Sequence, residues 1–87
     1  MSSTAEKSEF DFRAIRVELT DDQLCVTLND GREIRNPLEF YPKLARAEKK
    51  IRNNFRLMAQ GIGIEWPDLN EHLSIEGIVL GRRPIDW

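Results

Sequence analysis

The chain has 87 residues, a net charge of −2 and 40% hydrophobic residues, which are ordinary values for one small globular domain. A chain of this length buries only about 60% of the surface that its unfolded form exposes, so an elaborate enclosed active site is not expected. The single cysteine, Cys25, excludes an internal disulfide. Together with the single histidine, His72, it is too few for a zinc site of the usual four protein ligands.

Residues 1–9 are polar and rich in serine and glutamate, so we expect a mobile tail before a single α+β domain over residues 10–87. The first residues contain no apolar segment typical of a signal peptide. No later run approaches the ~18 apolar residues of a membrane span. We therefore expect a cytoplasmic protein that does not bind membranes.

Apolar and polar residues alternate in two runs within residues 15–28, which predicts two half-buried strands. A four-residue connection over residues 20–23 places all their apolar side chains on one face. The expected pairs are Leu19 with Leu24, Val17 with Val26 and Ile15 with Leu28.

The next turn contains Asp30 and Gly31. A two-residue hairpin loop would turn Ile34, the apolar residue of the third strand, to the wrong face. A three-residue loop with Gly31 at positive φ instead pairs Val26 with Ile34. We therefore expect a bulged loop in which Gly31 is costly to replace.

Pro42 suits the first turn of a helix, where its missing N–H is not needed. The apolar residues that follow fall on one side of a helical wheel, which predicts one main helix over residues 42–56, packed on the apolar face of the sheet. That apolar side consists of Leu44, Ala47, Ile51 and Phe55. The opposite side carries six cations: Lys43, Arg46, Lys49, Lys50, Arg52 and Arg56.

Two more strand segments are expected around Gly61, and Pro67 ends the second one. Ile62, Ile64 and Trp66 should complete the apolar layer. Trp66 should be a main stabiliser, since a tryptophan side chain buries roughly 150–250 Å².

Asp68 and Glu71 have the spacing of a capping box, which predicts a short helical turn that begins at Asp68. Ser74 is a candidate N-cap for a short C-terminal helix over residues 75–80, with Gly81 at its end. This segment should add Leu73, Ile75, Ile78 and Leu80 to the core.

These elements predict an α+β fold. It consists of a small antiparallel sheet, a three-stranded meander plus one or two further strands, with one main helix packed on one face and a short C-terminal helix.

No constellation in the sequence predicts catalysis, a cofactor or a metal. Gly61-x-Gly63 lacks the third glycine of a dinucleotide fingerprint, because Trp66 stands there, so a close backbone approach is the simpler explanation. Asp68, His72 and Glu76 would form a metal triad only on a continuous helix, which Ser74 and Gly77 between them disfavour. Cys25 lies in the middle of a strand with no identifiable base or oxyanion donors.

The charge is distributed in blocks: residues 40–64 hold six basic side chains and one acidic one, between flanks that are both acidic. Such a basic surface suits three interpretations: a solvated helix face, a surface for an acidic protein partner, or a surface for nucleic acid. The sequence leaves these three open, and it leaves homo-oligomerisation open as well.

Several short motifs are similar to a known family. They are the Asp30-Gly31 turn, Pro37-Leu38, the helix start from Pro42 to Leu44, and the pattern I-x-W-P-x-L-x-x-x-x-S from Ile64 to Ser74. Over residues 13–81 the chain resembles the bacterial family called domain of unknown function 2442. Its members usually carry acids in the segment after Trp-Pro, where this chain has Asn70 and His72.

The resemblance implies a small α+β fold with an antiparallel sheet and a non-enzymatic role. Some members are fused to a helix-turn-helix, and others are encoded beside a small toxin-like protein as antitoxin-like partners. The leading hypothesis is therefore a protein-interaction module, the antitoxin-like partner of a small toxin encoded by a neighbouring gene, which binds through the six cations. The second hypothesis is a nucleic-acid-associated accessory or regulatory domain that uses the same face.

Overall fold

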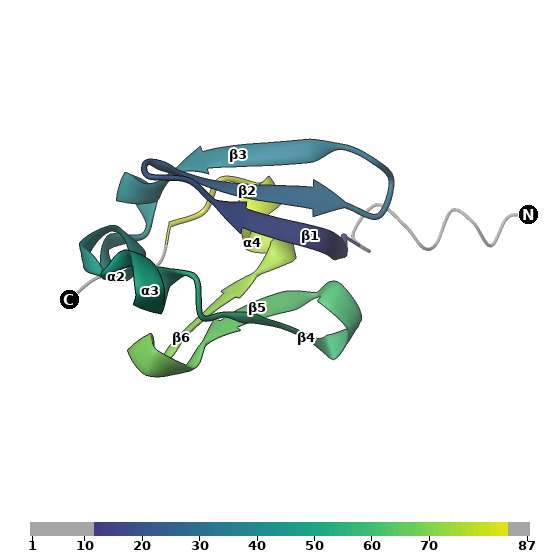
Figure 1. The fold of residues 1–87 in the computed structure, drawn as a ribbon. Coiled ribbons are helices and arrows are strands. Elements are labelled where there is room, and N and C mark those ends of the chain that lie inside the picture. Colours follow the sequence, from purple (N-terminus) through teal and green to yellow (C-terminus); the bar gives the residue numbers. More distant parts are fainter. Residues whose placement is uncertain (1–11, 84–87) are drawn as a thin grey trace, which may run out of the picture.

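The computed structural model describes residues 12–83, so the expected tail over residues 1–9 and Trp87 lie outside the described residues. The described chain forms two antiparallel sheets, one above the other (Figure 1). Sheet A is a meander of β1 (Ala14–Leu19), β2 (Gln23–Leu28) and β3 (Glu33–Pro37). Sheet B contains β4 (Arg56–Met58), β5 (Gly63–Trp66) and β6 (Glu71–Ser74), in that order. The α+β class is confirmed, but the expectation of a single sheet is wrong, because the later strands pair only with one another.

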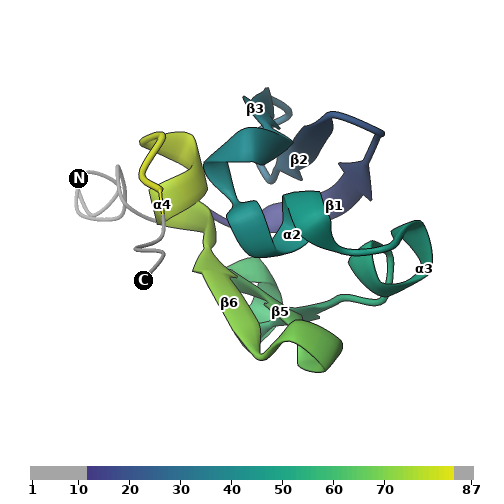
Figure 2. The same cartoon turned by 90° about the vertical axis from the view of Figure 1, so that its left-hand side faces the viewer.

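Short helices connect the two sheets, join the strands of sheet B and follow β6. Seen end-on in Figure 2, α2 lies between sheet A and sheet B, and α4 contacts both β3 and β6. The helices are η1 (Leu38–Phe40), α2 (Pro42–Arg46), α3 (Lys49–Arg52), η2 (Ala59–Gly61), η3 (Pro67–Leu69) and α4 (Ile75–Val79). In the described chain no helix is long and apolar enough to cross a membrane.

The predicted register of sheet A is confirmed over most of its length. Leu19 lies opposite Leu24, and Val26 lies between Val17 and Ile34. The turn into β3 is the expected bulged loop: the Leu28 N–H donates to the Arg32 carbonyl at 2.8 Å, and Gly31 has a φ of +93°.

The predicted pair of Ile15 with Leu28 is wrong, because β1 contains a bulge that places Ala14 opposite Leu28. Ile15 is consequently turned outward and is 63% exposed. Ala14 instead takes the buried position, and its backbone packs directly against Gly61 of η2.

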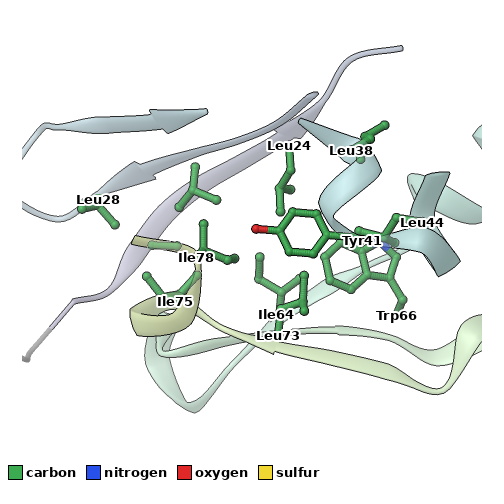
Figure 3. Close-up of a cluster of buried hydrophobic side chains, with 12 residues drawn as sticks. Leu24, Leu28, Leu38, Tyr41, Leu44, Ile64, Trp66, Leu73, Ile75 and Ile78 are labelled. Atoms are coloured by element: carbon green, nitrogen blue, oxygen red, sulfur yellow. The ribbon is translucent and has the colours of Figure 1, made fainter. Parts of the chain in front are cut away.

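The core lies between the sheets, and its largest fully buried side chains are Trp66 and Tyr41. In Figure 3 the Tyr41 ring lies between Leu24 of sheet A and Ile64 of sheet B, beside Trp66. The remaining members of the cluster are Ala14, Val26, Leu28, Leu38, Leu44, Leu73, Ile75 and Ile78. The expected role of Trp66, Ile64 and the apolar face of α4 in the core is thus confirmed.

Two residues expected in the core are exposed instead, Ile62 at 43% and Leu80 at 53%. Ile62 has helical dihedral angles after the turn at Gly61, so it does not share the alternation of β5. Leu80 caps α4 at its C-terminal end. At 100° per residue it projects away from the side that carries Ile75 and Ile78.

The contact at Gly61 yields a testable prediction. Gly61 has a φ of +94°, and a Cβ at this position would lie 2.6 Å from the Ala14 carbonyl oxygen. Gly31, at a φ of +93°, has open space around the same position. We expect Gly61→Ala to lower the free energy of unfolding by roughly 3 kcal/mol, from strained φ plus overpacking. Gly31→Ala should cost only the strain, about 1 kcal/mol. Urea denaturation measures both, and equal losses would contradict the proposed contact.

Candidate functional site

The six cations do not lie on one helix, so the predicted continuous helix over residues 42–56 is wrong. α2 and α3 are short, and Ala47 and Glu48 between them have extended dihedral angles. Leu44 is fully buried as expected, whereas Ile51 and Phe55 are only half-buried.

The helical segment is interrupted at Ala47 and Glu48 and ends at Arg52, and at this second point the Arg52 carbonyl accepts from a side chain. The indole N–H of Trp66 donates to the Arg52 carbonyl at 2.8 Å. In a continuous α-helix that carbonyl would accept from the N–H of Arg56. Instead Arg56 lies in β4, opposite Glu65 of β5. Packing of Trp66 therefore ends the helical segment at Arg52, a constraint that helical periodicity does not contain.

The Arg52 side chain stabilises the end of α2. Its guanidinium donates to the carbonyl oxygens of Leu44 at 3.1 Å, Ala45 at 3.3 Å and Ala47 at 3.0 Å. The last carbonyls of a helix have no partners within the helix, and a cationic donor is favourable there. Arg52 is thus part of the fold, and its contact with a partner stays a prediction.

Arg56 and Lys43 pair with acids of sheet B. The Arg56 Nε lies 2.7 Å from Oε1 of Glu65, and His72 on β6 lies 3.7 Å from the other oxygen of the same carboxylate. The Lys43 Nζ lies 3.5 Å from Oε1 of Glu71, whose side chain is only 12% exposed. These contacts connect α2 and β4 to neighbouring strands, and the Arg56 charge is offset within its own sheet.

The remaining cations, Arg46, Lys49 and Lys50, are exposed, and Lys43 is exposed as well despite its contact with Glu71. We define the cationic corner as the four exposed side chains Lys43, Arg46, Lys49 and Lys50. Lys49 lies 3.6 Å from Asp21, but both side chains are largely exposed, so this pair contributes little to stability. Glu48 is the acidic residue within the corner segment.

The residues predicted to begin or cap helices after β3 have mixed outcomes. Pro42 begins α2, and Pro67 begins η3 directly after β5, as expected. Ser74 is confirmed as the N-cap of α4, since its hydroxyl accepts from the Gly77 N–H at 3.0 Å. The capping box at Asp68 is wrong: Asp68 lies inside η3 and accepts from the side-chain amide of Asn54 at 2.8 Å.

Glu71, the other half of the predicted box, opens β6, a strand that sequence reasoning missed. The strand contains one inward apolar residue, Leu73, between His72 and Ser74. This alternation is too short to distinguish a strand from a turn. As a result His72 lies on a strand, not on the helix that a metal triad with Asp68 and Glu76 would need. Among residues 12–83, no group of three or more His, Cys, Asp and Glu side chains is placed to hold a metal ion. Cys25 is a buried free thiol in β2.

Asn36 is a buried polar residue that sequence reasoning also missed. It lies on the same face of β3 as Ile34, and its side-chain amide donates to the Tyr41 hydroxyl at 2.8 Å and to the Ile78 carbonyl at 3.0 Å. Burial raises the pKa of the Tyr41 hydroxyl above its usual value, and the bond from Asn36 opposes part of that rise. Asn36 thereby holds Tyr41 and the end of α4 against sheet A.

Two hollows open near β6. One, of about 170 Å³, lies between β6, α4 and Tyr41. The other, of about 230 Å³, lies beside Met58, Ile62 and Gly63 of sheet B and the turn that precedes β5. His72, Leu73 and Ser74 line both hollows, so β6 forms a wall between them.

The role of Arg52 yields a second prediction. We expect Arg52→Ala to lower the free energy of unfolding by about 2 kcal/mol, because three carbonyl oxygens lose a charged donor. Lys50→Ala, in the same helix, should change it by less than about 0.5 kcal/mol. Chemical denaturation compares the two variants. A loss no greater for Arg52→Ala than for Lys50→Ala would show that Arg52 is an ordinary surface cation.

Comparison with solved structures places the fold among known ones. The chain is similar to a protein of unknown function from Rhodospirillum rubrum, with a TM-score of 0.74 and 22% identity over 87% of this chain and 94% of that one. It is also similar to an uncharacterised protein from Chromobacterium violaceum, with a TM-score of 0.69 and 19% identity over 84% of this chain and 69% of that one. At these identities the likeness concerns the fold alone. No curated protein has a significantly similar sequence.

Residues 14–84 match the model of a family described as Protein of unknown function (DUF2442). The match spans both sheets and all the helices described above. It includes the bulged turn at Gly31 and the Trp66-Pro67 step, the positions on which the sequence resemblance was based. The chain therefore belongs to the DUF2442 family.

Proposed function

We propose that the chain is a cytoplasmic protein-interaction module that binds an acidic surface of a partner protein through the cationic corner. The observation that carries this proposal is that four exposed cations lie on α2 and α3, on either side of the bend at Ala47 and Glu48. The Arg52 guanidinium holds the backbone of this bend by hydrogen bonds to the Leu44 and Ala47 carbonyls. Because the backbone of the bend is already ordered, binding costs less conformational entropy than it would on a free loop.

The chemistry of the corner favours an acidic protein over nucleic acid. The nearby aromatic side chains, which could stack on bases, are engaged elsewhere: Phe55 packs against Trp66, and Phe40 lies under the Arg83 guanidinium. Lys43 and Lys49 already lie near carboxylates of this chain, Glu71 and Asp21, which shows that the corner accommodates such groups. Opposite charges across an interface give specificity and faster association.

The resemblance described above suggests the form of the partner, a small toxin-like protein encoded by a neighbouring gene, for which this chain would act as the antitoxin-like half. That form rests on the resemblance alone. The role proposed is binding and not catalysis, and it requires no cofactor.

Co-expression with the product of the adjacent gene tests the proposal. We expect the two proteins to co-purify, and the triple variant Arg46→Glu, Lys49→Glu, Lys50→Glu to lose at least tenfold in affinity for the partner. A matched control, Arg16→Glu, Arg32→Glu, Arg35→Glu, reverses three exposed cations of β1, β3 and the turn before β3, and it should bind like the wild type.

Absence of a complex with the neighbouring product, or equal losses in the two triple variants, would overturn the proposal. The second hypothesis has a distinct signature: binding to a DNA or RNA duplex that weakens steeply as salt rises from about 50 to 200 mM. If the wild type binds a duplex in this way and the corner triple variant does not, the partner of the cationic corner is nucleic acid and not an acidic protein.

A further inference from the structure

β6 is an edge strand with backbone groups available for a further strand. Within residues 12–83, β5 is the strand that pairs with it. The Ile75 N–H donates to the Ile62 carbonyl, and the register continues from there through Ser74 opposite Gly63. Backbone groups of an antiparallel strand point alternately toward and away from its neighbour. The N–H groups of His72 and Ser74 therefore point away from β5, toward the open edge.

The hollow of about 170 Å³ lies along this edge. Its lining includes the three consecutive residues His72, Leu73 and Ser74 of β6. The larger hollow meets Gly63 and Ile64 of β5 as well as β6, whereas this one takes its sheet B lining from β6 and not from β5. It therefore lies on the side of β6 that faces away from β5. The opposite wall is formed by Tyr41 and Ile78, which supply an apolar surface.

The charge beside the edge is positive. Arg82 and Arg83 line the hollow, and among residues 12–83 no acidic side chain lines it. The backbone of this segment is held in place, since the Arg82 N–H donates to the Gly77 carbonyl at 2.9 Å. The Arg83 guanidinium lies 3.9 Å from the centre of the Phe40 ring, which restrains its position. Carboxylates are the natural counterparts of two such guanidinium groups.

We propose that an extended segment of a partner protein adds to the open edge of β6 as a fourth strand of sheet B, with carboxylate side chains of that segment directed at Arg82 and Arg83. This inference rests on the proposed function, because it names a second surface of the same binding module. Strand addition takes its affinity from backbone hydrogen bonds and its specificity from neighbouring side-chain contacts, both of which this edge supplies.

The other edge strands and the other occupants fit less well. On β3, Arg35 lies 3.4 Å from Glu33 of the same strand, and on β1, Arg16 lies 3.4 Å from Glu18, so neither edge carries an excess of one charge. On β4, the Arg56 charge is offset by Glu65. A second copy of this chain would bring two identical arginine-lined edges together. Nucleic acid has the negative charge but lacks the peptide N–H and C=O groups that a strand offers to His72 and Ser74.

The test uses two arrays of six-residue peptides in which apolar residues alternate with glutamate or, in the matched array, with lysine. The full-length wild-type protein should bind glutamate peptides and bind lysine peptides at least tenfold more weakly. His72→Pro removes the outward N–H but spares the pairing with β5, since proline is tolerated on an edge strand. It should lose at least tenfold in affinity, whereas His72→Ala, which keeps the N–H, should bind like the wild type.

Two further measurements keep the proposal falsifiable if His72→Pro does not fold. Glutamate peptides with methylated backbone nitrogens should bind wild-type protein at least tenfold more weakly than unmodified ones. The variant Arg82→Glu, Arg83→Glu should lose glutamate peptides, and Arg16→Glu, Arg35→Glu should retain them.

Four results would overturn the proposal: no bound peptide on the glutamate array, equal binding of glutamate and lysine peptides, no effect of backbone methylation, or a wild-type dimer that His72→Pro dissociates.

The corner triple variant distinguishes the two proposals. If it loses the neighbouring protein but keeps the glutamate peptides, the corner and the β6 edge act separately. Failure of the arrays alone removes strand addition and leaves the corner as the proposed binding surface.

Discussion

The hydrogen bond from the Trp66 indole N–H to the Arg52 carbonyl joins the core of this domain to its surface. Trp66 is fully buried, and its ring packs against Phe55. The same Arg52 whose carbonyl accepts the indole uses its guanidinium to hold the last carbonyls of α2. The buried Trp66 thus binds the carbonyl at which the helical segment ends, and the side chain of the same Arg52 binds carbonyls of the bend that precedes Lys49 and Lys50.

The two proposed surfaces adjoin each other. Lys43, at the start of α2, lies 3.5 Å from Glu71, the first residue of β6. On the far side of the β6 edge, Asn36 holds Tyr41 and α4 in position through its two hydrogen bonds. One acidic partner could therefore contact the cationic corner and continue along the edge strand, so that charge attraction and backbone pairing act on the same molecule.

The parts predicted well from the sequence are governed by local rules. The alternation of apolar and polar residues predicted β1, β2 and most of their register. Gly31 in the sequence predicted the bulged turn, and Ser74 predicted the N-cap of α4. These features depend on residues close together in the chain, whose side-chain direction and φ preference are visible in the sequence.

The parts predicted poorly depend on contacts between distant segments. The predicted helix is interrupted at Ala47 and Glu48 and ends where the Arg52 carbonyl accepts from Trp66. The bulge that displaces Ile15 lies where Ala14 packs against Gly61, a residue distant in the chain. Of the six cations, the sequence could not separate Arg52, which supports the fold, from Lys50, which is exposed. Arg82 and Arg83 follow the last helix and belong to no periodic pattern, so only the fold shows that they lie beside β6.

Native-state amide hydrogen exchange tests most directly whether Trp66 holds both sheets in one cooperative unit. Val26 in sheet A and Ile64 in sheet B should show the same free energy of opening. Trp66→Phe keeps an aromatic ring but removes the indole N–H, and it should lower both values equally, by about 1–2 kcal/mol. Loss of protection at Ile64 with no change at Val26 would contradict the account, because the two sheets would then open independently.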